Sequence, residues 1–233
     1  MKKSEKIIKT LEEKACLKQK VFDKTLEAFR NLKEVLKKLV VEYNEKLEAH
    51  DQRVMLNFKN ISNFQCELKV GGDLLIFYMH SNIFEFDRNH DIWKTQYVKK
   101  NKQGSYSGII NVYNFLSDSF KYNRIEDLGY LIARIFVNKD AHYFVEGKQQ
   151  MAYLTKDFGN SIINEENVRD IIESAILYTQ KFDLLVPPYD DIKITNVNQI
   201  MELRKMGLKT GKRLGFSFNA DDVKGETLLY TGG

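Results

Sequence analysis

The side chains that could support catalysis are concentrated between Asp140 and Lys148, where two carboxylates lie close to a lysine. Residues i and i+2 of a β-strand project to the same side, so Glu146 and Lys148 would share one face. A carboxylate beside a lysine can hold Mg²⁺ and orient a water molecule for attack on a phosphodiester. Asp140, Glu146 and Lys148 are therefore the candidate catalytic residues, and Mg²⁺ is the cofactor that this chemistry requires.

Glu146-Gly147-Lys148, preceded by Asp140, resembles the Glu-x-Lys half-motif of the PD-(D/E)xK nuclease superfamily. The resemblance implies a metal-dependent nuclease or phosphodiesterase, and it covers only this short stretch. The Asp of that superfamily normally lies on a strand of its own, further from the Glu than Asp140 is. Because Gly147 is typical of a turn, we favour the interpretation of these residues as a hairpin end with solvated charges.

Two further polar segments could bind ions. Asp87–Asp91, close to His80, combines carboxylates and imidazoles that could hold a metal. Turns in which Asp and Asn side chains bond to the backbone explain the same residues, so we predict no metal site there. Gly207–Arg213 has neither the spacing nor the Ser or Thr of a phosphate loop. Its basic side chains still form a candidate anion-binding site, made of Lys209, Lys212 and Arg213.

The two cysteines, Cys16 and Cys66, show neither a disulfide framework nor the spacing of metal ligands. Neither has a histidine near it in sequence, so both are expected to be buried and unreactive. Unpaired cysteines are typical of a reducing compartment, and we predict a cytoplasmic protein. The longest apolar run, Leu74–Met79, is too short to span a membrane.

The strongest signal of structure is at the N-terminus. From Ser4 to about Ala49, apolar residues recur every three or four positions without a glycine or proline, which predicts one long amphipathic helix. Such a helix would be about 65–70 Å long, whereas the rest of the chain would form a globule with a radius of gyration of about 16 Å. The helix would therefore project beyond its own domain.

The projecting part of this helix needs a partner or must face solvent. Our hypothesis is self-association of residues 4–28, or their docking on another protein, through Ile8, Leu11, Ala15 and Phe22. A solvated overhang and two shorter helices joined at an unmarked break are the alternatives. Residues 1–50 hold thirteen Lys or Arg against nine Asp or Glu, and the rest of the chain is balanced. This surplus could attract nucleic acid or an anionic lipid surface, although a solvated face is the commoner explanation.

After Arg53 the apolar period becomes two, which predicts an antiparallel meander. Leu74–His80 is almost wholly apolar and is expected at the centre of the sheet, after a hairpin turn at Gly71-Gly72-Asp73. The predicted strands are Val54–Phe58, Phe64–Val70, Leu74–His80, Ile83–Asp87, Tyr97–Val98, Tyr106–Leu116, Ala141–Glu146, Gln150–Leu154 and Leu214–Phe218.

Further helices are predicted in the second half of the chain. The first rests on the helical spacing of Ile125, Leu128, Ile132, Ile135 and Phe136. Another is expected to begin after the cap residue Asn164 and to end before Pro187-Pro188, and a short one lies near Val197–Met206. The sequence thus predicts an α+β protein, with a long N-terminal amphipathic helix packed on an antiparallel β-sheet of five or more strands and two or three further helices.

We divide the chain into the helix (residues 1–50), a core domain (51–186) and a C-terminal segment (187–233). The predicted function is a cytoplasmic, non-catalytic binding or assembly module that acts through the helix and needs no cofactor. One alternative is the nuclease with Mg²⁺. The other is a small-ligand sensor, because nineteen of the 28 aromatic residues lie between Phe58 and Phe158 and could line an exposed sheet face.

Overall fold

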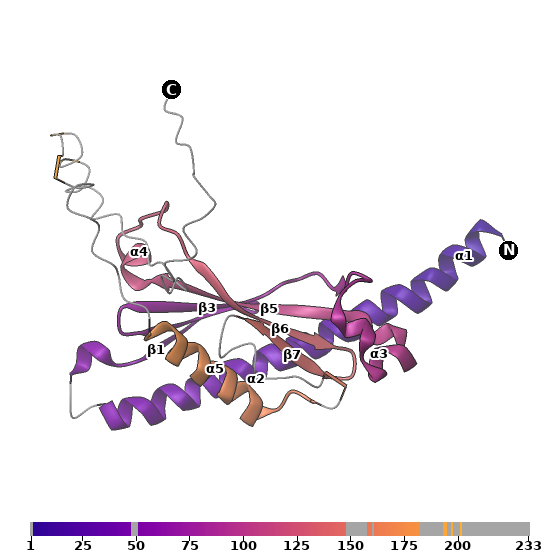
Figure 1. Ribbon diagram of the computed structural model, residues 1–233, viewed down its shortest axis with the longest axis horizontal. Coiled ribbons are helices and arrows are strands. Elements are labelled where there is room, and N and C mark those ends of the chain that lie inside the picture. Colours follow the sequence, from indigo (N-terminus) through magenta and orange to yellow (C-terminus); the bar gives the residue numbers. More distant parts are fainter. Residues whose placement is uncertain are drawn as a thin grey trace, which may run out of the picture.

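The computed structural model describes residues 2–47, 51–147, 158–159, 161–181, 193–194, 197 and 201. Within them, a long N-terminal helix accompanies a seven-stranded antiparallel sheet, so the predicted α+β fold is confirmed (Figure 1). The helices are α1 (Lys3–Thr10), α2 (Cys16–Leu47), α3 (Gln96–Lys100), α4 (Ser117–Lys121) and α5 (Glu165–Thr179), with a π-helical turn at Leu11–Ala15 and 3-10 turns at Gln52–Val54, Asp91–Lys94 and Lys102–Ser105. The strands are β1 (Asn57–Ser62), β2 (Gln65–Val70), β3 (Asp73–Met79), β4 (Phe84–Glu85), β5 (Tyr106–Leu116), β6 (Tyr130–Asn138) and β7 (Tyr143–Gly147).

The N-terminal helix is continuous from Lys3 to Leu47, as the apolar period predicts. Its buried residues begin only at Leu17, and every residue from Lys2 to Cys16 is exposed. We call residues 2–16 the arm, which projects past the sheet in Figure 1. The π-helical turn inside the arm has more residues per turn than an α-helix, so it rotates the side chains of α1 relative to the buried stripe of α2.

The sheet has the strand order β1-β2-β3-β5-β6-β7, and β4 pairs with β5 beside it. The central position predicted for Leu74–His80 is confirmed, because β3 lies between β2 and β5 and all but one of its residues are buried. The turn before it contains Gly71 at φ +57°, a backbone conformation that glycine adopts without strain.

One face of the sheet is covered by α2 and α5, which lie side by side in Figure 1. The core between the helices and the strands includes Phe29 of α2, Phe77 of β3 and Ile172 of α5, all fully buried. The packing of α2 on β5 is closest at Gly108, where a Cβ would lie 2.2 Å from Oγ1 of Thr25. The absence of a side chain at Gly108 is therefore what lets the helix approach the strand.

The helix predicted over Ile125–Phe136 is wrong. Tyr130–Asn138 form strand β6, and the first two apolar residues of the pattern are exposed in the loop before it. A register shift opposite Val112 gives β6 one extra residue. Because of this bulge, two consecutive residues, Ile132 and Ala133, both face the core. The apolar residues of β6 are then no longer spaced by two along the chain, and their spacing resembles that of a helix.

Smaller differences occur at the ends of the predicted elements. Tyr97–Val98 belongs to helix α3 and not to a strand, because the Thr95 side chain caps a helical turn by accepting the Val98 N–H at 3.3 Å. Strand β1 begins at Asn57, and the residues before it form a 3-10 turn. The predicted cap of α5 is confirmed, since the Asn164 side chain accepts a backbone N–H at 2.8 Å.

Several predictions lie outside the described residues. These are the strands Gln150–Leu154 and Leu214–Phe218 and the stop at Pro187-Pro188. Of the short helix expected at Val197–Met206, the structure describes Val197 and Met201, which are both helical.

Candidate functional site

Four polar side chains form a row across the face of the sheet opposite α2. Tyr78 of β3 lies opposite Asn111 of β5, Asn111 lies opposite Arg134 of β6, and Arg134 lies opposite Glu146 of β7. Directly opposed residues in antiparallel strands have Cβ atoms about 4.5–5.5 Å apart. The row therefore brings an amide, a guanidinium and a carboxylate together on one surface.

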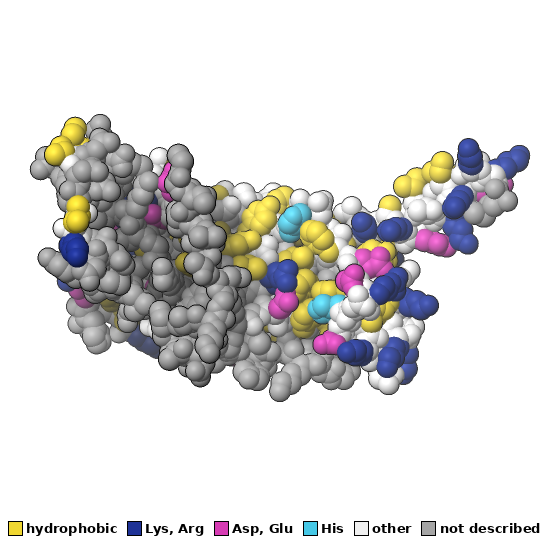
Figure 2. Space-filling model, turned by 45° about the horizontal axis from the view of Figure 1, so that its top comes forward, with side chains coloured by type: hydrophobic (Ala, Val, Ile, Leu, Met, Phe, Trp, Pro, Cys, Tyr) yellow, Lys and Arg dark blue, Asp and Glu magenta, His cyan; other side chains and the backbone are white. Residues whose placement is uncertain are grey.

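Asn111, Arg134 and Glu146 of this row form part of the floor of an open groove of about 480 Å³, which we call the sheet groove. Its apolar borders are Ile109, Tyr113, Leu131 and Phe136, and the segment Phe84–His90 forms its rim. Figure 2 shows hydrophobic side chains gathered on this part of the sheet, with histidine among them. A volume of this size falls in the range of sites that bind small molecules or short segments of a partner.

The charges on the floor of the groove are paired. Arg134 Nε donates to Glu146 Oε2 at 2.6 Å, and a terminal nitrogen of the same guanidinium contacts the same oxygen. The guanidinium carbon also lies 5.4 Å from the centre of the Phe136 ring. Glu146 therefore sits beside an arginine on an aromatic surface, and the two side chains are about half exposed.

Two carboxylates and one arginine lie on the rim of the groove. Glu85 accepts a hydrogen bond from the Tyr106 hydroxyl at 2.8 Å and pairs with Arg88. Asp87 Oδ1 accepts the backbone N–H of Asn89 at 2.9 Å, which is the turn geometry expected for this segment. Within the described part of the chain, no three His, Cys, Asp or Glu side chains are grouped so that they could hold a metal ion.

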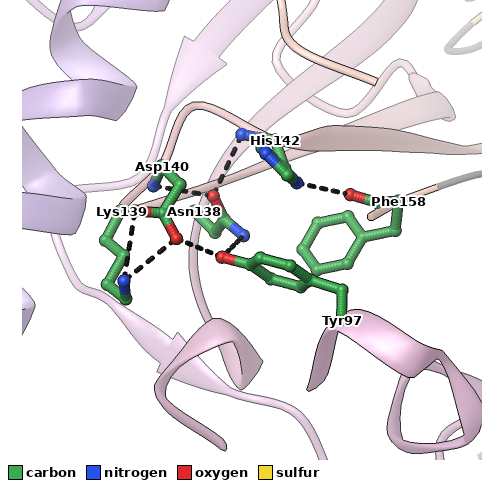
Figure 3. Close-up of polar contacts among 6 residues, drawn as sticks. All are labelled: Tyr97, Asn138, Lys139, Asp140, His142 and Phe158. Atoms are coloured by element: carbon green, nitrogen blue, oxygen red, sulfur yellow. Dashed lines mark hydrogen bonds and ion pairs between the residues drawn. The ribbon is translucent and has the colours of Figure 1, made fainter. Parts of the chain in front are cut away.

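Asp140 belongs to a second polar cluster, at the turn between β6 and β7 (Figure 3). The Tyr97 hydroxyl donates to Asp140 Oδ2, and Lys139 Nζ contacts both carboxylate oxygens at 2.9 and 3.1 Å. Buried Asn138 lies at the centre: its side-chain oxygen accepts the N–H groups of Asp140 and His142, and its amide donates to the Tyr97 hydroxyl at 3.1 Å. The cluster thus closes the turn.

The ionisation of this cluster follows from its contacts. Burial and the bond to Asp140 raise the pKa of the Tyr97 hydroxyl. Burial also acts to raise the pKa of Asp140, but the hydrogen bonds from Tyr97 and Lys139 outweigh it and hold that pKa below its ordinary value. At neutral pH the cluster therefore consists of a neutral phenol donating to a carboxylate, and Asp140 is a weak base.

The structure does not bring Asp140 and Glu146 together. Glu146 pairs with Arg134, whereas Asp140 bonds to the cluster around Asn138. Arg134 and Asn138 are four residues apart on β6, which corresponds to about 13 Å of strand. Lys148, the third predicted catalytic residue, lies outside the described residues, as do the predicted anion-binding residues Lys209, Lys212 and Arg213.

The predicted interface residues divide into two groups. Ile8, Leu11 and Ala15 are exposed on the arm. Phe22 is half-buried and packs on Phe64, with the ring centres 6.1 Å apart. Ile7, which is not among the predicted interface residues, is also exposed on the arm.

The cysteines differ from each other. Cys66 is fully buried, and burial raises the pKa of its thiol to about 12, so it stays protonated at neutral pH. Cys16 was expected to be buried, but it is exposed because it lies where the arm leaves the sheet. Neither cysteine forms a disulfide.

Comparison with known proteins finds no matching family model, no matching curated protein and no matching solved structure. Functional inference therefore rests on the geometry of the arm, the sheet groove and the Asn138 cluster. None of the helices in the described part of the chain combines the length and the apolar character needed to cross a membrane.

Proposed function

We propose that this chain is a non-catalytic assembly module that self-associates through the arm. The supporting observation is that Ile7, Ile8 and Leu11 are 59%, 56% and 57% exposed on a helical stretch with no buried residue. Fully burying an Ile or Leu side chain contributes about 1.5–3 kcal/mol. Three such side chains on one projecting helix therefore favour association with a second protein surface.

The positions of the acidic residues also support a non-catalytic role. Glu146 is held by Arg134 and Asp140 by Tyr97 and Lys139, so each carboxylate already has a cationic or hydrogen-bonding partner. A nuclease of the predicted type would need both carboxylates around one Mg²⁺, and the separation of the two along the sheet gives that alternative no support. The small-ligand sensor is the alternative that the sheet groove would serve.

We also propose that the protein acts in the cytoplasm. Both cysteines are free, although Cys16 is exposed and could be oxidised in a compartment where disulfides form. A free exposed thiol is better suited to a reducing compartment.

Light scattering during gel filtration of the full chain tests self-association. The wild type should have a mass above that of one chain, 27.3 kDa, and the mass should rise with concentration. The double variant Ile8→Ser/Leu11→Ser should weaken association at least about tenfold, because it removes two of the three exposed aliphatic side chains of the arm. The folded core should be unaffected, since neither side chain is buried.

The matched control is Val41→Ser. Val41 is also an aliphatic residue of the same helix and is 59% exposed, but it lies outside the arm. This variant should associate like the wild type. A wild-type protein that stays monomeric at every accessible concentration, or equal effects of the arm and control variants, would overturn the proposal.

A further inference from the structure

We infer that the sheet groove receives the arm of a second copy of this chain, so that two copies exchange arms. This inference rests on the proposed self-association and adds the surface that receives the arm.

The first argument is charge complementarity. The groove is lined by the carboxylates Glu85, Asp87 and Glu146 and by the guanidinium of Arg134, and Arg88 of the rim pairs with Glu85, so the groove carries one net negative charge. The arm, residues 2–16, holds five lysines against three glutamates, a surplus of two positive charges. The basic segment and the acidic groove are therefore opposite in sign, and attraction between them favours this pairing over association of two arms.

The second argument is the match of apolar surface. Lys3, Lys6, Ile7, Thr10 and Leu11 line one side of the arm, so that side presents two aliphatic residues flanked by two lysines. The groove combines exposed apolar side chains with carboxylates. The exposed apolar side chains include Phe84 of the rim and Leu131 of the apolar border, which are 40% and 41% exposed. An amphipathic helix that lays its apolar side into a groove is a common mode of recognition.

The third argument is that the arm cannot occupy the groove of its own chain. The arm continues without a break into α2, and α2 covers the face of the sheet opposite the groove. Folding back would require the helix to break and pass around the edge of the sheet. An arm that occupies the groove must therefore come from another copy.

The dimensions and the place of the arm fit a reciprocal exchange. From Lys3 to Cys16 the arm is about 20 Å long, which is enough to cover the polar residues of the groove from Asn111 to Glu146, about 10 Å of sheet. The root of the arm lies next to the rim, because Lys14 Nζ is 6.0 Å from the ring of Tyr106, whose hydroxyl bonds to Glu85. Two copies related by a two-fold axis near this point would each place their arm on the groove of the other, and the assembly would close as a dimer.

Charge exchange between two variants of the full chain tests the inference. The groove variant is Asp87→Asn/Leu131→Lys; asparagine keeps an oxygen for the N–H of Asn89, and Leu131 is partly exposed. The arm variant is Lys3→Glu/Lys6→Glu. The substitutions change the net charge of the groove from −1 to +1 and that of the arm from +2 to −2. In each variant alone the arm and the groove therefore carry charge of the same sign, and dimerisation should be at least about tenfold weaker than in the wild type.

An equimolar mixture of the two variants should recover the dimer, since the acidic arm of one meets the basic groove of the other and the remaining pair is wild type. Raising the salt concentration to about 1 M should weaken the wild-type dimer, because the Debye length falls to about 3 Å. Leu177→Lys is the matched control: this leucine is exposed on α5, away from the groove, and the substitution should leave dimerisation unchanged. Circular dichroism should confirm that all variants are folded.

The possible failures are distinguishable. If the wild type is monomeric, the proposed function and this inference both fail. If the arm variant is monomeric while the groove variant dimerises normally, the inference fails and self-association through the arm stands. If both variants are monomeric and their mixture does not recover the dimer, the groove does not receive the arm, and a different occupant, such as a small ligand, must be sought.

Discussion

At the scale of single residues, the turn between β6 and β7 depends on one buried amide. Asn138 accepts two backbone N–H groups of the turn and donates to the Tyr97 hydroxyl, so one side chain satisfies three partners. Ala141 lies in the same turn at φ +60°, an unusual backbone conformation for a residue with a side chain. The hydrogen bonds around Asn138 offset that strain.

Replacement of Tyr97 measures the strength of this cluster. Tyr97→Phe removes the hydroxyl that Asp140 and Asn138 share, and it should lower the free energy of unfolding by about 1–2 kcal/mol in a urea titration at pH 7. Tyr78→Phe is the control, because the Tyr78 hydroxyl has no hydrogen-bond partner among the described residues. Equal stability of Tyr97→Phe and the wild type would contradict a stabilising role.

The effect of this substitution should also depend on pH. The pKa of Asp140 is lowered in the folded protein, so its contribution is present above the pKa of an unfolded Asp and is lost on acidification. The pKa of Tyr97 is raised, so its contribution is present below the pKa of an unfolded Tyr and is lost as the pH rises. The stability difference between wild type and Tyr97→Phe should therefore be constant from about pH 5 to 9 and shrink on either side.

At the scale of elements, the packing of α2 on β5 decides how the long helix sits on the sheet. Thr25 is fully buried at this contact, and its hydroxyl bonds back to the Val21 carbonyl at 2.7 Å. This bond satisfies the only polar atom of the Thr25 side chain, so a threonine can occupy a buried position. Gly108 lies directly beneath it, so helix and strand approach each other at a point where neither side chain is large.

Gly108→Ala should therefore destabilise the protein. The new Cβ would lie within 3 Å of three Thr25 side-chain atoms, and relieving that overlap should cost about 1–3 kcal/mol in thermal or chemical unfolding. Gly72→Ala is the matched control, because nothing lies within 4 Å of its Cβ position and its φ is not positive. A Gly108→Ala protein as stable as Gly72→Ala would show that α2 does not pack as closely as described.

At the scale of the whole molecule, the arm is the part that its own fold does not stabilise. An isolated helix of this length is marginal in water, and the arm has no buried residue that could add tertiary stability. The remainder of the helix, in contrast, is fixed by a buried stripe that contacts the sheet and α5.

Hydrogen exchange should reveal this difference. In dilute protein, amides of residues 3–13 should exchange much faster than those of residues 21–39, because only the latter lie in a packed helix. If the arm associates as proposed, its protection should increase with protein concentration while that of residues 21–39 stays constant. Protection of the arm that does not vary with concentration would contradict association through this segment.

Much of the architecture could be predicted from the sequence. The apolar period determined the helix Lys3–Leu47, clean alternation determined β2, and an almost wholly apolar run determined β3. Asn164 marked the start of α5. These predictions succeeded because each depends on residues that are neighbours along the chain. The prediction failed at β6, where the bulge at Ile132 changed the local period, and at α3, where the cap at Thr95 was not recognised.

Which residues come together in the candidate sites was decided only by the tertiary structure. The sequence by itself determined a long helix with a basic surplus, a sheet and the residue types available on each strand. The polar row needs four strands aligned in one register, and the separation of Asp140 from Glu146 follows from how β6 and β7 pair. Local periodicity assigns each residue to one face of its strand, but which residues of neighbouring strands lie opposite one another is decided only when the strands pair. The same holds for the arm, whose exposure depends on where the sheet ends.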